Sequence, residues 1–80
     1  MATPHVTIYS TPTCHFCHEA KNFFTENGVQ FTDYNVGTDL AKRQEMIQKS
    51  GQMGVPVIEV GEKIIVGFDE AQLRDVLGIK

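Results

Sequence analysis

A short run rich in β-branched residues leads through a proline loop into two closely spaced cysteines, and this junction limits the folds open to the chain. The run is Val-Thr-Ile-Tyr at 6–9, the loop is Thr-Pro-Thr at 11–13, and the cysteines are Cys14 and Cys17. Apolar residues then recur at helical spacing up to Gly28, a residue type that commonly ends helices. The pattern predicts a strand that leads into a helix from about Cys14 to Asn27, with both thiols at the junction between them.

The start of a helix is a place where a cysteine becomes reactive. The thiolate, not the thiol, attacks disulfides, and the unpaired N–H groups and the positive dipole end of a helix favour the thiolate form there. Cys14, the outer residue of the pair, is therefore the predicted nucleophile. Cys17 lies one turn further in, close enough to form a short disulfide with Cys14 but better shielded from solvent. We expect Cys17 to be the resolving thiol.

The rest of the chain predicts five further elements. They are a strand at 30–36, a helix from Asp39 to Ser50-Gly51, strands at 57–60 and 63–66, and a last helix from Asp69 to Gly78. Aromatic and β-branched residues mark the strands, and Gly61-Glu62 suits a tight antiparallel turn. Leu40, Met46 and Ile47 form the expected inward stripe of the second helix. The predicted order is β-α-β-α-β-β-α.

Size and charge exclude several classes of function. The 80 residues fit one domain, 1–80, and a net charge of −3 without a basic cluster makes nucleic acid an unsuitable partner. No segment has the length and apolarity of a membrane span, and the N-terminus has no signal-peptide pattern, so we expect a cytoplasmic monomer. Cytosolic thiols are kept reduced, so a Cys-x-x-Cys pair there is catalytic or metal-binding more often than structural.

Three separated segments resemble the glutaredoxin family over essentially the whole chain. They are Tyr-Ser-Thr-Pro-Thr-Cys-His-Phe-Cys at 9–17, Val55-Pro56, and Gly67-Phe68-Asp69. The resemblance implies a minimal thioredoxin fold, an α/β structure in which three helices flank a four-stranded mixed sheet of order 2-1-3-4. It also implies a thiol-disulfide oxidoreductase that holds no tightly bound cofactor and uses glutathione as co-substrate. Its partners would be disulfide-containing or glutathionylated proteins.

The same resemblance implies a substrate groove around Cys14. Pro56 would be cis, which leaves the backbone of Val55 free to pair with an extended substrate. The residues expected to line the glutathione or substrate site are Thr11, Phe16, Val55, Pro56, Gly67, Phe68 and Asp69.

Several positions depart from the family pattern and leave two electron donors open. Thr11 stands where a lysine is usual, Val66 where a glycine is common, and Phe68 where a small residue is frequent. In these positions the chain resembles small redoxins that are recharged by thioredoxin reductase and donate electrons to ribonucleotide reductase. At Asp69 the chain instead resembles the family members that use glutathione, which have an acidic residue at this position. The sequence therefore favours neither glutathione nor thioredoxin reductase as the donor.

His15 replaces the usual proline between the cysteines and adds an imidazole near the nucleophile. When protonated it would favour the thiolate of Cys14, which predicts redox tuning toward a more oxidising couple; the alternative is a side chain that only faces water. Three other functions remain open. Cys14-x-x-Cys17-His18 satisfies the pattern for covalent c-type haem attachment, the thiols and a histidine are possible zinc ligands, and some family members bridge an iron–sulfur cluster between protomers.

Overall fold

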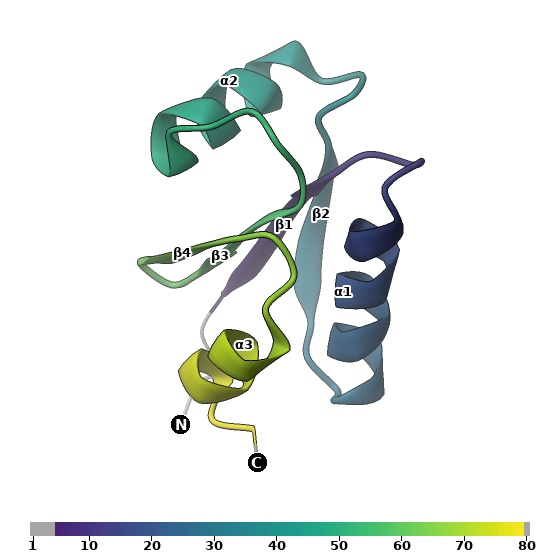
Figure 1. Cartoon of the computed structure of the whole chain (residues 1–80), viewed down its shortest axis with the longest axis vertical. Helices are drawn as coiled ribbons and strands as arrows, with labels where there is room; N and C mark the ends of the chain where they lie inside the picture. Colours follow the sequence, from purple (N-terminus) through teal and green to yellow (C-terminus); the bar gives the residue numbers. More distant parts are fainter. Residues whose placement is uncertain (1–4, 80) are drawn as a thin grey trace.

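The computed structural model describes residues 5–79, which form a four-stranded sheet with helices on both faces (Figure 1). In chain order the elements are β1 (Val6–Ser10), α1 (His15–Glu26), β2 (Phe31–Asn35), α2 (Leu40–Ser50), β3 (Val57–Val60), β4 (Lys63–Val66) and α3 (Glu70–Leu77). The predicted order is confirmed. No helix within this described range is long and apolar enough to cross a membrane.

The sheet has the order β2-β1-β3-β4, as the resemblance implied. β1 is parallel to β2 and antiparallel to β3, and β3 is antiparallel to β4. The β3–β4 turn contains Gly61 at φ 60°, a conformation that glycine adopts without steric cost. Tyr9 pairs with Val57. This register brings the loop that follows β1, which leads to the cysteines, beside Pro56 at the start of β3.

Alternate residues of the strands supply two cores on opposite faces of the sheet. Ile8 and Ile58 belong to the larger core, which they share with Phe24 of α1 and Leu73 of α3. Their neighbours in sequence, Tyr9 and Val57, belong to a smaller core with Met46 of α2. Because side chains alternate across a strand, α1 and α3 cover one face and α2 covers the other.

One predicted core position is wrong. Leu40 is 68% exposed, although it was assigned to the inward stripe of α2. At 100° per residue, Leu40 lies about 120° around the helix from the fully buried Met46, in the first turn and on a flank where Ile47 is only half-buried. The stripe facing the sheet is therefore narrower than the sequence pattern suggested.

Candidate active site

Cys14 is the N-cap residue of α1. Its backbone is extended, with φ −85° and ψ 115°, and its Sγ accepts a hydrogen bond from the backbone N–H of Cys17 at 3.1 Å. The Cys14 N–H in turn donates to the carbonyl of Thr11 at 3.3 Å, which closes the loop before the helix. Cys14 is partly exposed, and both cysteines are free thiols. A sulfur in this position is reachable from solvent and faces the N–H groups that stabilise negative charge.

Cys17 is the opposite case. Its side chain is fully buried. Burial in the first place, and the hydrogen bond with Cys14 in the second, together raise the pKa of the Cys17 thiol to about 12. The pair therefore combines one accessible sulfur at the helix terminus with one buried sulfur that keeps its proton at neutral pH, as expected for residues one helical turn apart.

A polar network that joins β1, β2 and α1 was not foreseen. Ser10, almost fully buried at the end of β1, donates from Oγ to Asp33 Oδ1 at 2.6 Å. Lys21 donates from Nζ to the other carboxylate oxygen of Asp33 at 2.8 Å. The Lys21 cation opposes the effect of burial on the Cys17 pKa. The i, i+4 spacing of Cys17 and Lys21 was the available signal, since it puts both on one face of α1.

The segments that carry Pro56 and Gly67 lie together. The Val55–Pro56 bond is cis, as the resemblance implied, and Pro56 is buried. The N–H of Gly67 donates to the carbonyl of Pro56 at 2.8 Å. Within residues 5–79, the backbone N–H and carbonyl of Val55 have no hydrogen-bond partner. That peptide edge is consequently able to pair with an extended chain.

The remaining predicted groove residues have different environments. Phe16, which lies between His15 and Cys17 in sequence, is 57% exposed. Asp69 is the N-cap of α3, where its Oδ1 accepts from the Gln72 N–H at 3.2 Å. Phe68 is half-buried, and its ring centroid lies 6.0 Å from that of Phe23, so it faces α1.

The two histidines near the thiols both contact neighbouring polar groups through Nε2. The side chain of His15 is 76% exposed, and its Nε2 lies 3.0 Å from Glu19 Oε1. His18 is exposed, and its Nε2 lies 2.8 Å from the carbonyl of Pro12, so Nε2 is the donor. His18 therefore ties the first turn of α1 to the preceding loop. Across the described chain, no group of three or more His, Cys, Asp or Glu side chains is arranged to hold a metal ion.

Comparisons with known proteins agree with this geometry. Residues 6–65 match the family model described as Glutaredoxin. A glutaredoxin-like 8.6 kDa protein in the rubredoxin operon of Clostridium pasteurianum is 44% identical over 72 residues, which cover 90% of this chain and 96% of that protein. Glutaredoxin 3 of Escherichia coli is 38% identical over 74 residues, covering 92% and 89% of the two chains. The solved structure of NrdH-redoxin from Escherichia coli has a TM-score of 0.77 at 25% identity, covering 89% and 92%.

These matches span the first strand, the cysteine pair and Pro56 together, and they argue against the c-type haem interpretation of the motif. A c-type haem protein would share the Cys-x-x-Cys-His pattern with this chain, but not the β2-β1-β3-β4 sheet and the sequence similarity that surround it. By its sequence, its fold and the placement of its two thiols, the chain belongs to the glutaredoxin family.

Proposed function

We propose that this chain is a dithiol–disulfide oxidoreductase that reduces protein disulfides or mixed disulfides with glutathione. The observation that carries the proposal is the contrast between the two sulfurs. Cys14 is accessible and bonded to a helix N–H at 3.1 Å, whereas Cys17 is buried with its pKa raised to about 12. The accessible Cys14 sulfur is suited to attack a substrate disulfide. The buried Cys17 sulfur is suited to stay protonated until the mixed disulfide has formed.

The reaction proceeds in two exchanges. The Cys14 thiolate attacks one sulfur of the substrate disulfide, the substrate S–S bond breaks, and the departing thiolate takes up a proton. Cys17 then loses its proton and attacks Cys14 Sγ, which releases the second substrate thiol and leaves a Cys14–Cys17 disulfide. Two electrons have passed to the substrate, and an external thiol or reductase restores the pair.

The first exchange prepares the second. The hydrogen bond with Cys14 and the charge on Cys14 both raise the pKa of Cys17. Both influences disappear once Cys14 Sγ is bound in a mixed disulfide. Cys17 then loses its proton more readily, at the step where its thiolate is needed, while Lys21 continues to favour the charged form.

Substrate is held beside Cys14 by groups of the two joined segments. Val55 pairs its free backbone N–H and carbonyl with the substrate backbone in the manner of an added strand. Gly67 and Asp69 supply backbone groups at the start of α3, and Phe16 and Thr11 flank the sulfur. These 80 residues act as one domain and as a cytoplasmic monomer, with no tightly bound cofactor.

Two donors fit the chain. Asp69 supports recharging by glutathione, as does the similarity to glutaredoxin 3. Thr11, Val66 and Phe68 support a second candidate, a redoxin that thioredoxin reductase recharges and that feeds ribonucleotide reductase. The fold shared with NrdH-redoxin, whose structure is described as explaining a thioredoxin-like activity profile, supports this second candidate.

Cysteine variants test the chemistry. Cys14→Ser removes the attacking sulfur and is expected to abolish reduction of every disulfide substrate, with NADPH consumption as the readout. Cys17→Ser is expected to accumulate mixed disulfides with protein substrates, seen as a mass increase, because nothing releases them. Turnover by the Cys14→Ser protein would contradict the proposal.

A second assay identifies the donor. The oxidised protein is offered glutathione with glutathione reductase, and in parallel thioredoxin reductase, each driven by NADPH. Fast consumption with glutathione alone assigns the glutathione route, and fast consumption with thioredoxin reductase alone assigns the second candidate. No consumption with either donor would contradict both.

A further inference from the structure

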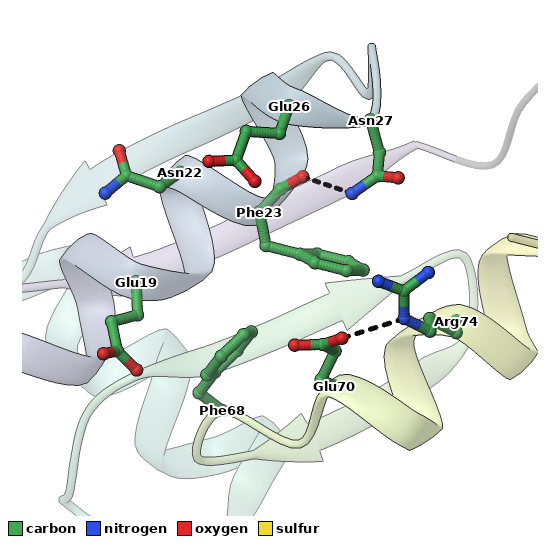
Figure 2. A pocket seen from close by; sticks show the side chains of 8 residues that line it. All are labelled: Glu19, Asn22, Phe23, Glu26, Asn27, Phe68, Glu70 and Arg74. Atoms are coloured by element: carbon green, nitrogen blue, oxygen red, sulfur yellow. Dashed lines mark hydrogen bonds and ion pairs between the residues drawn. The ribbon is translucent and has the colours of Figure 1, made fainter.

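A groove lies between α1 and α3, the two helices that cover the same face of the sheet. It has a volume of about 430 Å³. Phe23 and Phe68 face each other across it, with centroids 6.0 Å apart and planes at 62° (Figure 2). The other lining residues are polar or charged: Glu19, Asn22, Glu26, Asn27, Glu70 and Arg74. Phe23 is almost fully buried, so the half-buried Phe68 supplies the accessible aromatic surface beside the carboxylates.

The charges in the groove are unbalanced. Three carboxylates, those of Glu19, Glu26 and Glu70, face a single guanidinium. Arg74 is engaged with Glu70 at 2.9 Å and lies 5.2 Å from the Phe23 ring centroid. Within residues 5–79, the exposed Glu26 carboxylate makes no hydrogen bond or ion pair. Carboxylates beside aromatic rings are the surroundings that arginine and lysine side chains prefer, because the cation meets both a counter-charge and a ring face.

Two lining residues of the groove connect it to the candidate active site. Phe68 directly follows Gly67, whose N–H is bonded to Pro56. Glu19 is paired with His15, the residue next to Cys14. Along α1, Glu19 and Glu26 lie five and twelve residues beyond Cys14, which is about 8 and 18 Å at 1.5 Å per residue. An extended peptide covers those distances with about two to six residues.

We propose that this groove docks a basic segment of a protein substrate, with arginine or lysine about two to six residues from the cysteine that Cys14 attacks. The proposal rests on the proposed function and names the substrate class for it. An arginine in the groove would pair with Glu26 and stack on Phe68. Anionic peptides, glutathione among them, gain nothing from this surface, so the groove distinguishes protein substrates from the tripeptide.

Reduction of three peptide disulfides tests the proposal. The peptides are identical except that the flanking positions carry arginine, glutamine or glutamate, and the readout is kcat/KM at low salt. We expect the arginine peptide to exceed the glutamate peptide about tenfold, since each exposed ion pair contributes a factor of about 1.4 to 5. In Glu19→Gln/Glu26→Gln the ratio should fall to about twofold, and salt should reduce the wild-type ratio in the same way.

A matched control removes charge without touching the groove. Glu62→Gln, in the β3–β4 turn, makes the same substitution at an exposed site and should leave the ratio at its wild-type value. Equal kcat/KM for the three wild-type peptides would overturn the proposal. The proposal would also be overturned if the ratio of kcat/KM between the arginine and glutamate peptides stayed unchanged in Glu19→Gln/Glu26→Gln. It would equally be overturned if Glu62→Gln lowered that ratio as much as the double variant does.

Binding without redox chemistry separates this inference from the proposed function. An arginine-rich peptide lacking cysteine is titrated into the reduced protein while the amide NMR signals of Glu26 and Phe68 are followed. We expect salt-sensitive shifts that are lost in Glu19→Gln/Glu26→Gln. If no peptide disulfide is reduced but these shifts occur, the proposed function fails and the groove stands. If all three peptides are reduced and no shifts occur, the groove proposal fails and the function stands.

Discussion

Burial of the Cys17 thiol makes the stability of the reduced protein depend on alkaline pH. Folding raises the pKa of this thiol from its ordinary 9.0 to about 12, chiefly through burial. Below pH 9 the thiol is neutral in both the folded and the unfolded chain. Between pH 9 and 12 the unfolded chain releases the proton while the folded chain retains it. Stability present below pH 9 is therefore lost as the pH rises through that window.

The size of the loss follows from the two pKa values. At pH 8 the linkage is negligible, and at pH 10 ionisation of the unfolded chain lowers the free energy of unfolding by about 1.4 kcal/mol. That is a substantial fraction of the roughly 4–12 kcal/mol expected for a domain of this length. Cys17→Ala removes the titrating group but keeps the backbone N–H that bonds Cys14. Its stability should fall about 1.4 kcal/mol less over the same interval.

Urea denaturation of the two reduced proteins at pH 8 and pH 10, under a thiol-free reductant, measures the difference. The comparison cancels other alkaline contributions, including that of Lys49, whose pKa is raised by its bond to Glu59 in both proteins. Alkylation at pH 8 gives an independent check, because Cys14 should be modified in the native protein and Cys17 only after unfolding. Equal pH dependence in the two proteins would refute the argument.

Three further substitutions have defined outcomes. Leu73→Ala opens a cavity in the larger core, where Leu73 is fully buried, and should lower the free energy of unfolding by about 2–5 kcal/mol in urea titrations. Lys49→Met removes the ion pairs with Glu59 at 3.0 Å and Glu45 at 3.2 Å, each expected to cost up to about 1 kcal/mol, less at high salt; a loss independent of salt would contradict an ionic origin. His15→Pro removes the imidazole beside Cys14 and should make the reduction potential about 10–30 mV more negative in equilibration with glutathione, and an unchanged potential would exclude tuning by His15.

Local signals in the sequence were enough to place the helices and strands. The bounds of β3 and β4 were predicted residue for residue, since Gly61 and Glu62 interrupt two β-branched runs. β2 is one residue shorter at each end than the predicted 30–36, although the N–H of Val36 still bonds the Ser10 carbonyl at 2.9 Å. The strand order came from the family resemblance, because nothing local specifies which distant strands pair.

The candidate site was predictable only where it follows from helix geometry. The contrast between Cys14 and Cys17 is a consequence of one turn of helix, and it was predictable from their spacing. The bond from Lys21 to Asp33 joins α1 to β2 across twelve positions, and the sequence carries no sign of that register. The groove between α1 and α3 likewise depends on how two helices pack on one sheet, which no helical pattern contains.

Phe68 shows how a departure from a family pattern acquires a physical meaning. In the sequence, Phe68 stood out as a bulky residue where the family frequently has a small one. In the structure its ring packs toward Phe23 and lines the space between α1 and α3, among carboxylates. Thr11, where a lysine is usual, is bonded to Cys14 through its carbonyl and supplies no cation there. Under the groove proposal, both changes act in one direction, away from attraction of an anionic tripeptide and toward basic protein segments.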